Sequence, residues 1–161
     1  NYKDGKLDGK RTWWYENGQI QQEADYKDGK LDGILTSWHE NGQKESEGNY
    51  KDGKEDGKWT MWYENGQIKS EVNYKDGKLD GKWTNWYENG QIMYERNFKY
   101  DEFFDGKWIW WYEDGQKRWE ANYKYGKLSG KRTVWHYGGR NSSLMKSEEI
   151  YRGGVCISFC N

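Results

Sequence analysis

Proline is absent from the 161-residue sequence, and cysteine occurs only twice. Because proline cannot donate a hydrogen bond to a β-ladder, its absence favours strands whose backbone N–H groups are all paired. No apolar run is long enough to span a bilayer, and no signal peptide or basic tail is recognisable. The sequence starts at Asn1 without Met, so we expect a fragment or a processed product, and the N-terminus does not indicate a compartment.

Leu, Ile, Val and Phe are also scarce and together number 20 residues. Such a low content combined with high net charge is typical of disorder, but here 26 basic residues balance 27 acidic ones. The apolar surface comes instead from 12 Trp and 14 Tyr, side chains that each bury about 150 to 250 Å². The composition therefore predicts a thin, half-wetted structure, and the balanced charge gives no reason to expect nucleic acid as a partner.

The two cysteines, Cys156 and Cys160, lie four residues apart near the C-terminus. In an extended strand they are about 13 Å apart on one face, which is too far for a mutual disulfide. A second pair of ligands that could complete a zinc site is missing from the sequence. We therefore expect two free thiols in a terminal strand.

One 24-residue phrase, YKDGKLDGKWTNWYENGQIMYERN from Tyr74 to Asn97, is repeated about six times. Repetition at a fixed period sets the architecture before any local motif is considered. We predict six hairpin repeats in residues 1–137, then an irregular last repeat with C-terminal capping strands in residues 138–161. The repeats open at Tyr2, Tyr26, Tyr50, Tyr74, Phe98 and Tyr123, and Tyr151 begins a truncated seventh.

Each repeat contains two turn signals. Asn89-Gly90 and its equivalents separate β-rich runs, which indicates a two-residue type I′ turn with positive φ at both central residues. A second turn follows each opening tyrosine, as at Asp28-Gly29, and we expect Phe103-Phe104 to disrupt this turn in the fifth repeat. The predicted fold is all-β, an elongated single-layer antiparallel β-meander of six 24-residue β-hairpin repeats, about 55 to 60 Å long.

A two-residue turn also fixes the strand register and sorts the side chains onto two faces. The expected pairs are Tyr87–Ile92, Asn85–Tyr94 and Trp83–Arg96 on the first face, and Trp86–Met93, Thr84–Glu95 and Lys82–Asn97 on the second.

The first face varies among repeats and is rich in aromatic side chains. Trp110 is expected directly opposite Trp119, an aromatic pair that stabilises a sheet by up to about 1 kcal/mol. Apolar patches that extend over several repeats mark contact surfaces, and Trp and Tyr are enriched at interface hot spots. The candidate interaction surface comprises Trp59, Trp83, Trp108, Trp110, Trp119, Tyr63, Tyr87 and Tyr112.

The second face hardly varies, and we expect its tryptophans to pack on one another. Its recurring glutamates are expected to pair with the neighbouring Lys and Thr columns. The tryptophans of this uniform face are Trp14, Trp38, Trp62, Trp86, Trp111 and Trp135, and the glutamates are Glu23, Glu47, Glu71, Glu95 and Glu120.

The phrases YENGQIKSEVNYKDGKLDGKW (Tyr63 to Trp83) and WYENGQ resemble the MORN-variant repeat, a short hairpin unit common in bacterial proteins and often given a YwqK-like antitoxin label. The resemblance extends from Tyr2 to about Tyr137. It implies an elongated β-meander that acts as a scaffold or binding surface, with links to protein assembly and to membrane phospholipids. The family pattern contains no catalytic residues.

The residues themselves indicate no catalytic, metal or cofactor site. Most acidic residues recur in several repeats, and no nucleophile is recognisable beside a base. The DGKLDG phrase of residues 28–33 lacks the spaced ligands and closing Glu of a calcium loop, so we interpret it as a turn. His39 and His136 stand at tyrosine positions about 38 Å apart, so we expect structural substitutions rather than a shared metal.

We therefore expect a non-enzymatic scaffold that docks a protein partner or a second copy of itself through the variable face. The alternative is a carbohydrate-binding or cell-envelope-binding module, because short aromatic hairpin repeats resemble the choline-binding repeats of surface proteins. Weak binding to anionic phospholipid is a third hypothesis, and the balanced charge disfavours it.

Overall fold

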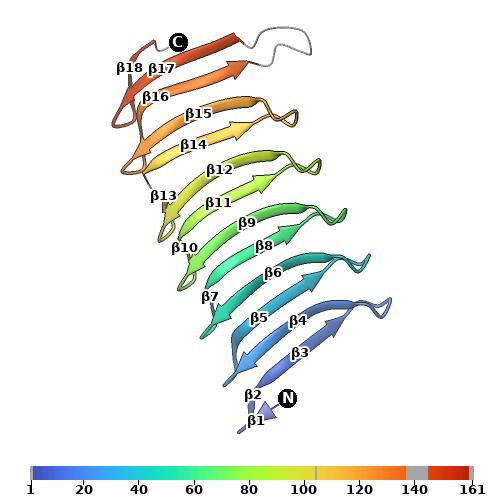
Figure 1. The fold of residues 1–161 in the computed structure, drawn as a ribbon. Helices are drawn as coiled ribbons and strands as arrows, with labels where there is room; N and C mark the ends of the chain where they lie inside the picture. The colour runs from blue at the N-terminus through green and yellow to red at the C-terminus, as the bar shows by residue number, and fades with distance from the viewer. Residues whose placement is uncertain (1, 104, 137–144, 160–161) are drawn as a thin grey trace.

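The computed structural model describes residues 2–103, 105–136 and 145–159. Within these ranges the structure has eighteen strands and no helix (Figure 1). Sixteen of the strands form one antiparallel sheet, and β1 and β2 form a separate two-stranded sheet. The strands are β1 (Tyr2–Lys3), β2 (Lys6–Leu7), β3 (Gly9–Trp14), β4 (Ile20–Lys27), β5 (Lys30–Trp38), β6 (Lys44–Lys51), β7 (Lys54–Glu55), β8 (Gly57–Trp62), β9 (Ile68–Lys75), β10 (Lys78–Leu79), β11 (Gly81–Trp86), β12 (Ile92–Lys99), β13 (Glu102–Phe103), β14 (Gly106–Trp111), β15 (Lys117–Lys124), β16 (Lys127–His136), β17 (Met145–Arg152) and β18 (Val155–Ser158).

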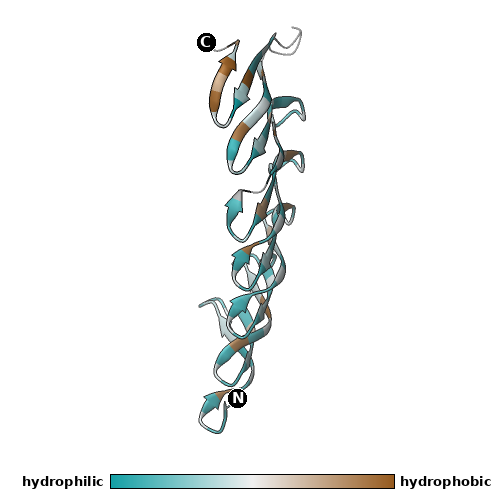
Figure 2. Ribbon diagram, turned by 90° about the vertical axis from the view of Figure 1, so that its left-hand side faces the viewer, coloured by the Kyte–Doolittle hydropathy of each residue, from teal (hydrophilic) through white to brown (hydrophobic). Residues whose placement is uncertain are grey.

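Strands that follow one another in the chain lie next to one another in the sheet. The main order runs from β3 to β18 without a crossover, and the short strands β7, β10 and β13 pair at its margin with β6, β9 and β12. The two ends of the chain lie at opposite ends of the stack (Figure 1), and the edge view shows a thin, curled slab without a second layer (Figure 2). The predicted elongated single-layer meander is confirmed.

The turns that follow the opening tyrosines have the type I′ geometry. Asp28 and Gly29 have φ values of 51° and 84°, and Lys27 pairs with Lys30 across the turn. Positive φ at both central residues gives a twist that matches the flanking strands. The predicted disruption in the fifth repeat is wrong, because Tyr100 and Asp101 form the same turn with φ values of 52° and 68°.

The Asn-Gly turns differ from the predicted type I′ geometry. Only the glycine is left-handed, with φ 82° at Gly90, whereas Asn89 is not among the residues with positive φ. The Gly90 N–H donates to the Tyr87 carbonyl at 2.9 Å, and the Tyr87 N–H donates to the Gln91 carbonyl at 2.8 Å. These bonds close a three-residue loop with a glycine at its αL position, another common hairpin connection.

A β-bulge compensates for the extra loop residue. Trp86 pairs with Ile92, so the predicted pairs Trp86–Met93 and Tyr87–Ile92 are wrong, and Met93 is the additional residue on its strand. Beyond the bulge the pairing of Trp83 with Arg96 is as predicted. A bulge adds one unpaired residue to a ladder, which offsets the longer loop and restores the register.

A glycine after each Leu-Asp or Glu-Asp step allows the sheet to bend. Gly33 has φ 120°, and a Cβ atom there would lie 2.9 Å from the Cβ of Asp25. The ladder shifts register between Ala24 and Tyr26 at the same level. Bulged strands bend and twist more strongly, and Figure 2 shows the turn-bearing margin curling away from the sheet.

The core is thin and lies on the variable face. Among the residues that the structure describes, six hydrophobic ones are buried, and each pairs in the ladder with another residue of that face. Small or polar side chains occupy much of the rest of this face. The stability of the sheet therefore depends on aromatic rings rather than on a continuous aliphatic layer. The buried hydrophobic residues are Ala24, Leu35, Val72, Tyr94, Phe98 and Ala121.

Candidate functional site: an aromatic groove on the variable face

The tyrosines beside the Asn-Gly loops join neighbouring repeats. The Tyr63 hydroxyl donates to the carbonyl of Trp86 at 2.7 Å. Tyr87 and Tyr112, also candidate surface residues, make the equivalent bonds to the next repeat at 2.9 and 3.0 Å. His39 stands at a tyrosine position, and its Nε2 lies 3.2 Å from the Trp62 carbonyl. This geometry confirms the structural substitution predicted for His39.

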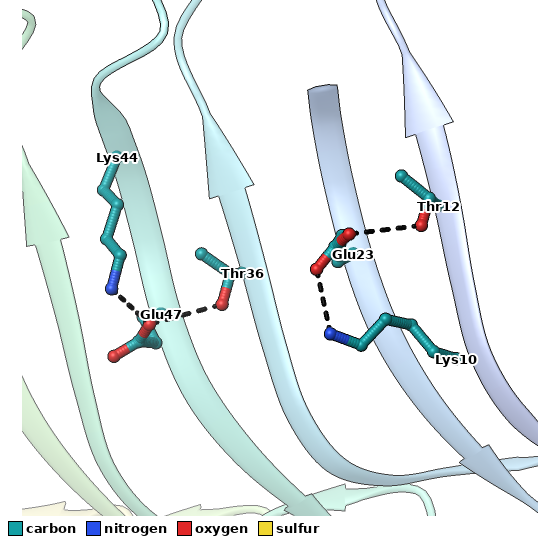
Figure 3. Close-up of polar contacts among 6 residues, drawn as sticks. All are labelled: Lys10, Thr12, Glu23, Thr36, Lys44 and Glu47. Atoms are coloured by element: carbon teal, nitrogen blue, oxygen red, sulfur yellow. Dashed lines mark hydrogen bonds and ion pairs between the residues drawn. The ribbon is translucent and has the colours of Figure 1, made fainter. Parts of the chain in front are cut away.

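On the uniform face the recurring glutamates form ion pairs with lysines (Figure 3). Lys10 Nζ lies 3.0 Å from the Glu23 carboxylate, and the Thr12 hydroxyl donates to the same carboxylate at 3.3 Å. In the second repeat Ile34 stands at the lysine position, and Glu47 instead pairs with Lys44 of its own strand at 2.6 Å. The predicted partnership of the recurring glutamates is confirmed. Each exposed pair contributes only about 0 to 1 kcal/mol.

The pKa of Glu120 shows the effect of the paired lysines on a carboxylate of this face. Burial raises the pKa of Glu120, but hydrogen bonds and charge from Lys117 and Lys107 outweigh burial and hold the pKa below its ordinary value of 4.5. A carboxylate held ionised by two lysines is a poor proton donor near neutral pH. The uniform face therefore resembles a structural ion-pair network rather than an acid–base site.

The variable face contains an aromatic groove, defined here by Trp83, Tyr94, Arg96, Trp108, Trp110 and Trp119. Strands β11, β12, β14 and β15 supply these residues. Trp110 pairs with Trp119 as predicted, with ring centroids 6.3 Å apart. Tyr94 lies 5.0 Å from Trp110 and 6.0 Å from Trp83, so the rings form a continuous row. The four tryptophans are half-buried, because neighbouring aromatic rings cover part of each one.

Arg96 lies inside this row, and the sequence analysis did not single it out. Its guanidinium carbon is 4.1 Å from the Tyr94 ring centroid, 5.2 Å from Trp83 and 5.3 Å from Trp108. These are cation–π distances. The first, second, third and fifth repeats carry Ala, Gly, Val and Ala at this position, and the sixth carries Glu149. A charge at a position that is small and uncharged in the other four of the first five repeats was the signal that could have identified Arg96.

A cavity of about 200 Å³ opens among Tyr94, Arg96, Trp108, Trp110 and Trp119, and Glu95 and Ile109 complete its lining. The Glu95 carboxylate is already paired with Lys82. The indole Nε1 of Trp110 is buried there without a hydrogen-bond partner among the described residues. Burial raises the pKa of Tyr94, whereas the charge and hydrogen bond of Arg96 act in the opposite direction. The groove thus combines apolar walls with donor groups and positive charge.

Trp59 does not join this groove. It packs edge-on against Tyr50 at 5.7 Å, and its ring fills the space beside Gly48. The eight predicted surface residues therefore separate into three groups: Trp83, Trp108, Trp110 and Trp119 in the groove, Trp59 with Tyr50, and Tyr63, Tyr87 and Tyr112 beside the loops.

The sequence signature of the MORN repeat variant matches five segments, at residues 7–28, 31–52, 55–76, 79–100 and 104–125. Together these segments cover more than half of the chain. The chain belongs to the MORN repeat variant family. The family is a repeat scaffold that is generally non-catalytic. No curated protein matches the chain, so the antitoxin label has no named relative to support it.

The last family match ends at residue 125, two residues after Tyr123 opens the sixth predicted repeat. Strands β16, β17 and β18 nevertheless continue the sheet formed by the MORN repeats. The division at residue 137 stays a prediction, because residues 137–144 lie outside the described part of the chain.

The prediction of two free thiols is wrong for Cys156, which is disulfide-bonded. Cys160 lies outside the described residues. The prediction assumed one extended strand through both cysteines, but β18 ends at Ser158 and Phe159 has φ 58°. A left-handed residue ends the strand, so the spacing of about 13 Å for an extended strand does not apply.

A larger hollow of about 700 Å³ lies at the turns of the fifth and sixth repeats, lined in part by Tyr100, Asp101, Asp105 and Tyr125. Among the described residues no group of three His, Cys, Asp or Glu side chains is arranged to hold a metal ion. The same residues form no helix that is long and apolar enough to cross a membrane.

Proposed function

We propose that this MORN repeat protein is a non-enzymatic scaffold that docks a protein partner, or a second copy of itself, through the aromatic groove. The observation that carries the proposal is the row of Trp83, Tyr94, Trp110 and Trp119 on one face, with a cavity between the rings. Half-buried Trp and Tyr side chains in a pocketed patch are the residues and the setting of interface hot spots.

The opposite face supports this choice of surface. Its carboxylates already form ion pairs with lysines, so a partner that binds there must break these ion pairs. The alternative of a choline-like or glycan ligand has less support, because the chain's own Arg96 lies over the rings of the groove and leaves less room for a ligand cation.

The test combines light scattering and partner recovery with the triple variant Trp108→Ala, Trp110→Ala, Trp119→Ala. We expect self-association or partner recovery to fall at least tenfold, because truncation of a hot-spot residue costs about 2 kcal/mol or more. Trp14→Ala is the matched control, since Trp14 is 61% exposed and lies on the uniform face.

Far-UV circular dichroism establishes that the triple variant retains its strands, and Trp119→Leu provides a milder change if it does not. Assembly and recovery that match the unaltered protein would reject the proposed docking role. Titrations with choline and a glycan array, followed by tryptophan fluorescence, address the alternative, and a saturable response there would favour it.

A further inference from the structure

Arg96 is a positive charge without a carboxylate partner in the described part of the chain. The same cross-strand row continues through Trp108 and Ala121 to Arg132, and Arg132 is 2.9 Å from the Glu149 carboxylate. Arg96 instead contacts the rings of Trp83, Tyr94 and Trp108. Its guanidinium therefore keeps the capacity to bind an oxyanion bidentately.

The cavity beside Arg96 fits one side chain. Its volume of about 200 Å³ lies below the range of about 300 to 1,000 Å³ usual for small-molecule and cofactor sites. The unpartnered Nε1 of Trp110 belongs to the same lining. Buried donors usually have acceptors. An oxygen-bearing side chain that enters between the rings is thus favoured over a bulky ligand.

A second guanidinium adds to the charge of the groove. Arg118 lies 5.9 Å from the Trp110 ring centroid and 5.7 Å from that of Tyr112. Two arginines in a protein of net charge −1 do not form the cationic track that nucleic acids require. Nor do they form the cluster of about 4 to 8 basic residues typical of anionic membrane binding.

We infer that the aromatic groove accepts an Asp or Glu side chain of an extended acidic protein segment, with Arg96 as the charge partner and Trp108, Trp110 and Trp119 as the walls. The inference rests on the proposed docking function and specifies the chemistry of the partner. Alternate side chains of an extended segment point to the same side, so an acidic residue in the cavity directs apolar residues two and four positions away toward the ring row.

The experiment titrates the full chain with two acetylated, amidated heptapeptides, EEFEFEE and QQFQFQQ, and follows tryptophan fluorescence at low salt. We expect the glutamate peptide to bind at least tenfold more tightly than the glutamine peptide, because one charged hydrogen-bonded contact is at stake. Arg96→Gln is expected to remove this preference. Arg11→Gln changes an arginine on the same face at the other end of the sheet, where its guanidinium lies 4.6 Å from the Trp13 ring centroid. It is the control and should retain the preference.

Each outcome decides the inference. Equal binding of the two peptides, lost in the triple tryptophan variant, overturns the acidic preference but leaves the docking function in place. No binding of either peptide overturns the acidic preference, and the assembly measurement then judges the docking function separately. Tighter binding of a single-stranded oligonucleotide or of phosphatidylserine vesicles than of EEFEFEE also overturns it. A glutamate preference that survives Arg96→Gln overturns the role of Arg96.

Discussion

The tyrosine hydroxyl beside an Asn-Gly or Asp-Gly loop could bind either a partner or the next repeat. In the structure it binds the next repeat. Tyr15, Tyr63, Tyr87 and Tyr112 donate across the repeat boundary to tryptophan carbonyls. A carbonyl that loses its donor in a partly buried ladder costs free energy. The recurrence of tyrosine at this position is therefore explained by contacts between repeats, without any partner.

Tyr63→Phe should lower the free energy of unfolding by about 1 kcal/mol, because it removes one hydrogen bond and leaves the Trp86 carbonyl without that donor. Urea titrations followed by far-UV circular dichroism measure the change. Tyr125→Phe is the control, since Tyr125 is 83% exposed and its hydroxyl makes no hydrogen bond among the described residues. Equal losses in the two variants would contradict the inter-repeat role.

Between neighbouring strands, the sizes of facing side chains complement one another. Gly48 lacks a side chain where Trp59 lies, and a Cβ at Gly48 would come within 2.1 Å of the indole. In the preceding pair of strands the equivalent residues are Ala24 and Leu35, which face each other and are both buried. A large residue on one strand is thus accommodated by a small one on its neighbour.

Gly48→Ala should destabilise the protein by about 1 to 3 kcal/mol, the usual cost of overpacking, because the Trp59 ring must move. Adding Trp59→Leu recreates the Ala–Leu pair of the preceding strands and should recover most of the loss. Thermal unfolding of the two single variants and the double variant measures this coupling. Additive losses in the double variant would show that the two positions do not interact.

The whole molecule is a thin sheet whose stability is distributed among repeats and the interfaces between them. The contribution of its tyrosines to the free energy of unfolding depends on pH. Burial is the largest cause of a raised tyrosine pKa in several repeats, so the folded state favours the neutral phenol. The affected residues are Tyr15, Tyr50, Tyr63, Tyr74, Tyr94 and Tyr123.

The protein should therefore unfold at alkaline pH. A folded pKa raised above the ordinary value of 10.0 means that this stabilisation is complete below pH 10 and is lost as the pH rises through the higher folded pKa. Urea midpoints measured across this range, together with tyrosinate absorbance, give the linkage. Full ionisation of the tyrosines before any loss of strand signal would contradict the prediction.

The sequence alone determined the repeat, the meander and the division into two faces, because a fixed period and alternating side chains express local geometry. Trp110 opposite Trp119 and the glutamate ladder followed directly from that alternation. The three-residue loop at Asn89-Gly90 and the bulge at Met93 were not predicted, since their effects on register cancel and leave the inner pairs unchanged. Only the tertiary structure decided that Arg96 lies among three aromatic rings and that Trp59 does not join them, because packing between neighbouring repeats places the rings.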